Sequence, residues 1–218
     1  MNVQLWGFWR SLATFRVRIA LNLKGIAYEE NPVDLIAGVQ RGEAYRAVNP
    51  QMVLPALVDG NGPVLFQSLA ILEYLDETHP EPALLPRDPR GRARVRGLAA
   101  IVAADSHPLI VPRIREYLET ELGVGEEDRA RWCRHWIEAG LEAIESHLAN
   151  EPETGRYCHG DAITVADICL VSLTVGAKLF GASLDGLPNV ARISEACLAE
   201  PAFAAAHPLR QAGAPKAA

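Results

Sequence analysis

The chain has 218 residues, which corresponds to one large domain or two small ones at roughly 150 residues per domain. Apolar residues make up 49% of it, enough for a sizeable core, so a chain that is disordered throughout is excluded. The 27 acidic residues outnumber the 21 lysines and arginines. This balance provides no electrostatic footprint for the phosphate backbone of nucleic acids, so we expect no nucleic-acid partner.

The sequence also argues against a membrane or a metal site. No apolar run approaches the roughly 18 residues of a membrane span. The N-terminal stretch MNVQLWGFWRSLATFRVR lacks the basic-then-apolar order of a signal peptide. The four cysteines form no CxxC pair, and the six histidines show no metal-ligand spacing on a helix face. We therefore expect a cytoplasmic protein with no membrane contact and no bound metal.

A proline-rich stretch divides the chain. Residues 80–90 read PEPALLPRDPR, with four prolines in eleven residues. Proline lacks a donor N–H and disfavours helix in the residue before it, so this stretch is predicted to be extended. We predict a first domain over 1–80, a linker over 81–89 and a second domain over 90–218.

The first domain mixes the periodicity of strands with that of helices. In chain order we expect a strand over 3–8, a helix over 15–24 that ends at Gly25, and an extended segment over 26–35. A short helix up to Ala47, a hairpin over 56–66 and a helix capped by Ser68 that stops at Pro80 should follow. The first domain is predicted to be α/β.

The second domain shows no strand pattern. A long helical stretch over 93–121 is expected to kink at Pro108 and Pro112, and a second amphipathic helix covers 126–148. Thr164 and Asp167 have the spacing of a capping box before a buried helix that runs through Val175. We predict an all-α domain.

The turn before the first helix carries a candidate site. A hydroxyl at Ser11 or Thr14 lies among unpaired N–H donors, where the helix dipole also favours an anion. A thiol, with a pKa of about 8.5, can be held as thiolate in such a place. The alternative is that either hydroxyl simply caps the helix.

Two further segments can bind a peptide-like ligand. Pro55 directly precedes a predicted strand, which suits a cis bond that lets Leu54 offer its backbone N–H and C=O to an extended ligand. Gln67 and Ser68 stand at a helix start, where a serine hydroxyl and an amide can hold a carboxylate. A trans turn proline and a simple N-cap are the alternatives.

Taken together, these segments resemble the zeta class of glutathione transferases, over nearly the whole chain. The similarity is carried by RVRIALNLKG, QSLAI and several shorter motifs, namely Arg10-Ser11, Asn49-Pro50, Pro55-Ala56-Leu57, Gly160-Asp161 and Ala166-Asp167. It implies a thioredoxin-like N-terminal domain, an all-helical C-terminal domain and a homodimer. Phe8-Trp9-Arg10-Ser11 and Asp105-Ser106-His107-Pro108 are most similar to bacterial glutathione-dependent maleylpyruvate isomerases, whose relatives are the maleylacetoacetate isomerases.

The resemblance also implies roles for single residues around glutathione as cofactor. Ser11 would donate its hydroxyl to the thiolate, and Leu54, after which Pro55 fixes the turn, would pair by backbone with the cysteinyl part. Gln67 and Ser68 would hold the γ-glutamyl carboxylate. Gln40 stands where the family contacts the glycyl end.

This sequence departs from the family pattern in two places. The common zeta motif continues Ser-Ser-Cys-Ser after the arginine, whereas this chain has Ser11-Leu12-Ala13-Thr14, so Ala13 replaces the motif cysteine. Leu54 replaces the usual valine, a change that a backbone contact should tolerate.

The implied chemistry is cis-trans isomerisation of a small dicarboxylate keto-acid by reversible addition of the thiolate. Arginine suits such a substrate because its planar fork pairs bidentately with carboxylates. Arg10 and Arg113 are candidates for it, and Lys178 is a further substrate-binding one. Arg10 and His107 are also catalytic candidates. The alternatives are a solvated Arg113 and a His107 that merely belongs to the kink at Pro108.

Two other functions stay open at this point. The first is a general transferase that conjugates glutathione to electrophiles or dehalogenates α-haloacids; it needs the thiolate site but no paired arginines. The second is a non-catalytic scaffold on the same fold, against which Ser11 argues because such proteins lose the activating hydroxyl.

Overall fold

A computed structural model of the chain describes residues 2–215 and divides them into two compact units. The first unit contains the described residues up to 83 together with those from 200 onward, and the second contains 84–199. The prediction had placed the C-terminal segment in the helical domain. The segment instead packs on the first unit, where Asn22 Nδ2 donates to the Ala202 carbonyl at 3.0 Å and Phe203 is fully buried. Residues 1 and 216–218, the outer ends of the predicted domains, lie outside the described residues.

The first unit is built on a four-stranded mixed sheet with the order β2-β1-β3-β4. β1 runs parallel to β2 and antiparallel to β3, which pairs antiparallel with β4. The strands are β1 (Val3–Gly7), β2 (Tyr28–Pro32), β3 (Ala56–Asp59) and β4 (Leu65–Phe66). Alternate β1 residues are buried, as the period of a strand requires.

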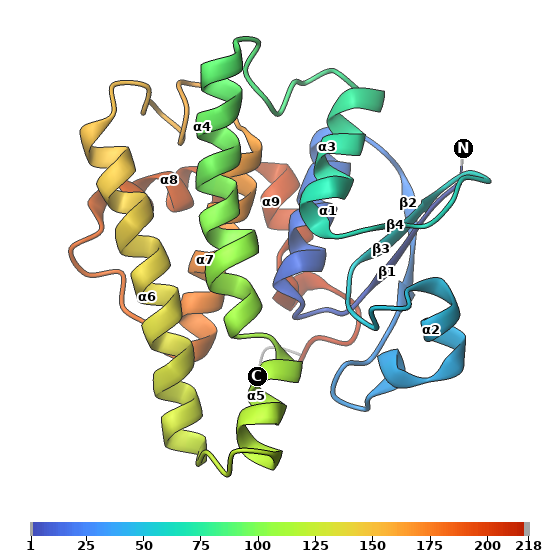
Figure 1. Ribbon diagram of the computed structural model, residues 1–218. Coiled ribbons are helices and arrows are strands. Elements are labelled where there is room, and N and C mark those ends of the chain that lie inside the picture. The colour runs from blue at the N-terminus through green and yellow to red at the C-terminus, as the bar shows by residue number, and fades with distance from the viewer. Residues whose placement is uncertain (1, 216–218) are drawn as a thin grey trace. The chain divides into compact units, whose positions relative to one another are not determined.

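Helices cover this sheet, and Figure 1 shows α1 and α3 side by side. The helices of the unit are α1 (Leu12–Leu23), α2 (Glu43–Val48), α3 (Ser68–Thr78) and α9 (Pro201–Ala206). All residues of α1 from Leu12 to Leu21 are buried, because α3 and α9 both pack against it. The predicted α/β arrangement is confirmed.

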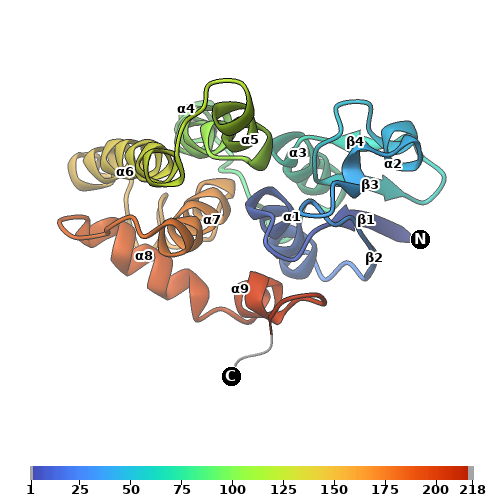
Figure 2. The same ribbon diagram turned by 90° about the horizontal axis from the view of Figure 1, so that it is seen from below.

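The second unit is helical in the part of the chain that the structure describes. Its helices are α4 (Pro89–Ala100), α5 (Pro112–Thr120), α6 (Glu126–Asn150), α7 (Val165–Phe180) and α8 (Pro188–Leu198). Figure 2 shows α7 among α4, α6 and α8, all of which it contacts. The predicted capping box starts α7, since the Asp167 carboxylate accepts from the backbone N–H of Thr164 at 2.8 Å.

The predicted interruption of the helical stretch over 93–121 at Pro108 and Pro112 is confirmed, and the chain is also irregular before it. α4 passes into a π-helical turn (Ile101–Ser106), then a 3-10 helix (His107–Leu109), and α5 begins anew at Pro112. Proline has no N–H to donate, which explains the break. The π-helical turn packs closely against α6. A Cβ on Gly140 of α6 would lie 2.0 Å from Ser106 Oγ, so glycine is required for this approach.

Among residues 2–215 no helix is long and apolar enough to cross a membrane. The same residues contain no group of three or more histidine, cysteine or acidic side chains that could hold a metal ion.

Candidate functional site

The sheet register gathers several loops of the first unit at one edge. β1 and β2 end together because Gly7 pairs with Pro32. β3 starts where β1 ends, since Trp6 pairs with Ala56, and Ala56 pairs in turn with Phe66 at the end of β4. The segments that follow Gly7, Pro32 and Phe66, and the one that precedes Ala56, therefore leave the sheet at the same edge.

Ser11 occupies the N-cap of α1, directly after this edge. Its backbone is extended, with φ −70° and ψ 114°, and its Oγ accepts a hydrogen bond from the Thr14 N–H at 3.2 Å. The Ser11 N–H closes a turn by donating to the Phe8 carbonyl at 3.0 Å. A partly exposed hydroxyl thus lies at the positive end of the helix dipole, as the stabilisation of a thiolate requires.

Arg10 precedes this cap and is partly exposed. Its guanidinium carbon lies 5.9 Å from the centroid of the Trp9 ring, near the limit of a cation–π contact. Trp9 packs against the buried cluster of Phe8, Val33, Tyr45 and Leu54. The turn that carries Arg10 and Ser11 is therefore anchored on the loop that contains Leu54.

Hydrogen bonds from Tyr45 and Asn49 hold the loop that contains Leu54. The Tyr45 hydroxyl and Asn49 Nδ2 both donate to the Val53 carbonyl, at 2.7 and 2.8 Å. Burial raises the pKa of Tyr45 to about 12, so its hydroxyl stays protonated and keeps donating. The Leu54–Pro55 bond is cis, as predicted. In the described chain, the backbone N–H and C=O of Leu54 have no hydrogen-bond partner.

Gln67 and Ser68 stand across the hairpin from this loop. The prediction that Ser68 caps α3 is wrong, because Gln67 holds the N-cap position and Ser68 is the first helical residue. Gln67 has a left-handed φ of +68°, a conformation that costs energy in a non-glycine residue and concentrates at ligand sites. Its Nε2 donates to Gln51 Oε1 at 2.8 Å. Ser68 is 5% exposed.

Gln40 lies on a 3-10 helix (Val39–Arg41) that follows β2. Its side chain is 7% exposed, and its Oε1 has no hydrogen-bond partner among the described residues. A buried amide oxygen without a partner is unfavourable by about 1–3 kcal/mol, so it is a suitable acceptor for a ligand donor.

His107, Arg113 and Lys178 belong to the second unit. His107 lies in the 3-10 helix and is partly exposed, Arg113 stands exposed in the first turn of α5, and Lys178 stands exposed in the last turn of α7. The structure gathers the first-unit candidates at one sheet edge. It places these three on separate elements, and their roles stay predictions.

Sequence reasoning missed the residues that support the site. Tyr45 and Asn49 are four positions apart at the end of α2, a helical spacing that indicates a shared target, here the Val53 carbonyl. Gln51 gave no signal, since its contact with Gln67 depends on the hairpin bringing two distant segments together.

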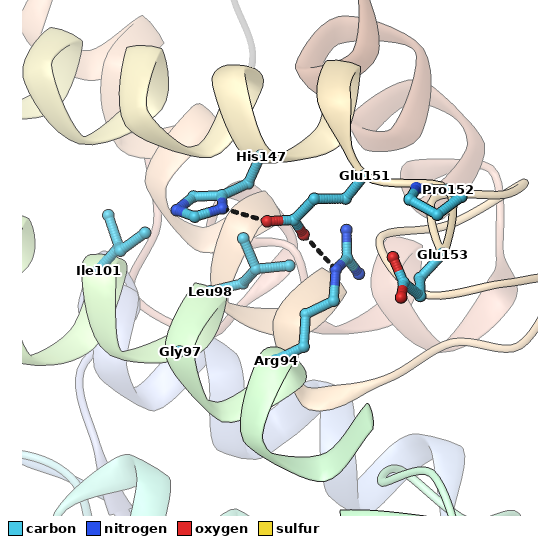
Figure 3. A pocket seen from close by; sticks show the side chains of 8 residues that line it. All are labelled: Arg94, Gly97, Leu98, Ile101, His147, Glu151, Pro152 and Glu153. Atoms are coloured by element: carbon cyan, nitrogen blue, oxygen red, sulfur yellow. Dashed lines mark hydrogen bonds and ion pairs between the residues drawn. The ribbon is translucent and has the colours of Figure 1, made fainter. Parts of the chain in front are cut away.

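The second unit contains a cavity of about 700 Å³ that none of the predicted residues line (Figure 3). Leu98 and Ile101 form an apolar wall, and Glu151 binds both Arg94 and His147, the latter at 2.5 Å between Nδ1 and Oε1. Hydrogen bonds lower the pKa of Glu151 below its usual range. The bond from His147 has the larger effect and the bond from Arg94 the next. Arg94 also donates to the Cys158 carbonyl at 2.6 Å, so this network fastens α4 to the chain after α6.

Comparison with known proteins places these features in context. Residues 10–78 match the glutathione S-transferase N-terminal domain family. The chain is 46% identical to the maleylpyruvate isomerase of a Ralstonia species over 209 residues, 96% of this chain and 98% of that protein.

Two solved structures are similar over nearly the full length. The maleylacetoacetate isomerase of Methylobacterium extorquens AM1, with bound malonate and glutathione, has a TM-score of 0.96 and 54% identity, covering 97% of this chain and 99% of that one. A holo maleylpyruvate isomerase, described as a bacterial zeta-class glutathione S-transferase, has a TM-score of 0.94 and 44% identity, covering 97% and 100%.

Proposed function

Because the chain belongs to the zeta-class glutathione transferase family, whose relatives here are named maleylpyruvate and maleylacetoacetate isomerases, we propose that it is a glutathione-dependent cis-trans isomerase of a maleyl keto-acid. The reaction converts maleylpyruvate to fumarylpyruvate, or maleylacetoacetate to fumarylacetoacetate. One observation carries the proposal: the relative at TM-score 0.96 holds glutathione and a small dicarboxylate together.

The residues of the sheet edge fit glutathione. Leu54 offers a free backbone N–H and C=O to the cysteinyl unit, in the manner of an added strand. Gln67 and Ser68, at the start of α3, are suited to the γ-glutamyl carboxylate. The orphaned Oε1 of Gln40 is suited to a donor at the glycyl end.

Glutathione, when bound, supplies a thiolate that adds reversibly to the conjugated double bond and so permits rotation. The Ser11 hydroxyl donates a hydrogen bond to the thiolate sulfur, and the N-terminus of α1 favours the same negative charge. Arg10 and Arg113 bind the carboxylates of the substrate, with Lys178 as a further cation. His107 stabilises the enolate charge that develops on the substrate carbonyl.

We propose in addition that the protein acts as a homodimer in the cytoplasm, in the breakdown of aromatic compounds. The family resemblance supports the dimer and the pathway class. The cysteines support a reducing compartment, because all four are buried and none forms a disulfide, namely Cys133, Cys158, Cys169 and Cys197.

An absorbance assay tests the proposed function. Maleylpyruvate and maleylacetoacetate are supplied in parallel, with and without glutathione, and the appearance of the fumaryl product is followed. We expect glutathione to accelerate at least one of them strongly. If neither is accelerated while an aromatic electrophile is conjugated, the protein is a general transferase instead.

A further inference from the structure

A buried ion pair lies beneath the turn that carries Ser11. Arg18, seven residues after Ser11 on α1, has a side chain that is 0% exposed. A buried guanidinium is costly unless its donors are paired. Arg18 lies one helical turn beyond Thr14, so both side chains occupy the same face of α1.

Glu30 on β2 provides the pairing. Arg18 Nε donates to Glu30 Oε2 at 2.8 Å, and Nη2 binds Glu30 Oε1, so the guanidinium fork meets both oxygens of the carboxylate. Such bidentate pairs fix geometry as well as charge. The Glu30 side chain is only 25% exposed. The pair therefore links α1 to β2 in one defined arrangement.

The third guanidinium nitrogen of Arg18 contacts the turn that precedes Ser11. Arg18 Nη1 donates to the Trp9 carbonyl at 3.4 Å, a long bond with a charged donor. Trp9 and Arg10 are the central residues of the turn that Ser11 N–H closes on Phe8. The two common turn types differ by a flip of that central peptide. A donor beneath the Trp9 carbonyl therefore selects one orientation of the Trp9–Arg10 peptide.

The Arg18–Glu30 pair lies very close to Gly7 at the end of β1. A Cβ on Gly7 would lie 2.4 Å from Glu30 Oε1 and 2.7 Å from Thr14 Cγ2. Glycine is required here because the carboxylate lies directly against the backbone that leads into the turn.

We propose that Arg18 and Glu30 are positioning residues that fix the Trp9–Arg10 peptide and thereby the placement of the Ser11 hydroxyl and the Arg10 side chain. The inference deepens the proposed function and rests on it for the role of Ser11. Neither side chain is assigned a contact with glutathione or substrate.

Arg18→Met tests the proposal, with Lys24→Met as the matched control. Lys24 is the C-cap residue of α1, at the opposite end of the helix from Ser11. Its side chain is also 0% exposed, and it pairs with Asp76 at 2.8 Å. Both changes remove a buried ion pair from the same unit. Only Arg18→Met should speed hydrogen exchange of residues 8–14 in the ligand-free protein, by at least about tenfold over the rest of the first unit.

The kinetic measurements should likewise be affected by Arg18→Met and not by Lys24→Met. Arg18→Met should lower kcat by roughly 10- to 100-fold, as small misplacements do, and raise the apparent pKa of the bound glutathione thiol. KM for glutathione should change much less. Arg18→Lys, which keeps the charge and one bond to Glu30, should recover part of kcat and serves if Arg18→Met folds poorly.

Uniform or unchanged exchange in the Arg18 variants, with a wild-type thiol pKa and kcat, would overturn the proposal. Failure of the wild-type protein to isomerise either keto-acid would instead count against the proposed function. The exchange comparison needs no substrate, so it still decides whether Arg18 fixes the turn.

Discussion

The Ser11 Oγ lies 3.2 Å from the Thr14 backbone nitrogen and accepts its N–H. An oxygen that accepts in this way keeps its own proton available. In the described residues that proton has no acceptor. The hydroxyl is thus oriented by the helix and free to donate, so the cap and the proposed catalytic role, which the sequence left as alternatives, are compatible.

Ser11→Ala should lower turnover by more than tenfold and raise the apparent pKa of the bound glutathione thiol. A tenfold loss corresponds to about 1.4 kcal/mol, comparable to one hydrogen bond to a charged group. Loss of the cap should also destabilise α1 by about 1 kcal/mol. Steady-state kinetics, thiolate absorbance and thermal unfolding measure the three effects.

Two controls separate these effects. Asp88→Ala removes a comparable cap, since the Asp88 carboxylate accepts from the Gly91 N–H at 2.8 Å at the start of α4. It should affect stability without moving the thiol pKa. Thr14→Val keeps the shape of a side chain whose Oγ1 is buried and has no partner in the described chain. A larger loss of turnover in Thr14→Val than in Ser11→Ala would mean that the catalytic hydroxyl is misassigned.

Local patterns predicted the elements of the first unit because each is short and strongly periodic. The helix after Ser11 and the hairpin over 56–66 follow from alternation, capping and turn residues. Features that depend on tertiary contacts could not be predicted from these local patterns. Glu30 pairs with Arg18 only because β2 lies beside β1.

The same reason explains the errors. Gln67 adopts a left-handed φ that no local rule assigns to glutamine, so Ser68 was the expected cap. The predicted second domain extends to residue 218, but α9 in the C-terminal segment packs against α1 of the first unit. The direction of packing for a short apolar helix is not encoded in its own pattern.

Gly140→Ala should destabilise the second unit by about 1–3 kcal/mol, the usual cost of overpacking. The added methyl would lie 2.0 Å from Ser106 Oγ, in the π-helical turn just before His107. Adding Ser106→Gly removes the contacting atoms and should restore much of the loss. Denaturant unfolding of the single and double variants measures this. Equal losses in both would show that the Ser106 contact is not the cause.

Tyr45→Phe should raise KM for glutathione several-fold and leave kcat nearly unchanged, because it loosens the loop that presents Leu54. The Val53 carbonyl keeps its hydrogen bond from Asn49, so the loss of glutathione-binding free energy should stay at about 1 kcal/mol. Tyr74→Phe is the control: its hydroxyl donates to Asp59 Oδ2 at 2.8 Å, at the other end of β3. A similar rise in KM in both variants would contradict a role for the Leu54 loop.

The raised pKa of Tyr45 should also affect the stability of the protein at alkaline pH. Burial raises the pKa of Tyr45 from 10.0 to about 12, so the folded state favours the protonated phenol. Its contribution to stability is complete below the ordinary pKa and is lost as pH rises through the raised one. The free energy of unfolding of the wild type should therefore fall between pH 10 and about 12 more steeply than that of Tyr45→Phe. Parallel curves for the two proteins would refute this assignment.

Arg10→Met and Arg113→Met should separate isomerase from general transferase. Met keeps much of the apolar stem but removes the fork that pairs with a carboxylate. Loss of a charge-assisted bond of about 1.5–3 kcal/mol should reduce isomerase kcat/KM by roughly 10- to 150-fold in either variant. Conjugation of glutathione to an uncharged aromatic electrophile should barely change, because that substrate has no carboxylate to bind.

Arg131→Met is the control for this comparison, since Arg131 is exposed on α6 and pairs with Asp128 at 2.7 Å. It should leave both reactions unchanged. Equal losses on both substrates in the Arg10 variant would assign Arg10 to glutathione binding or to the structure of the turn. Full isomerase activity in both arginine variants would leave the dicarboxylate without its proposed partners, and the choice between the two enzyme classes would then depend on the parallel keto-acid assay alone.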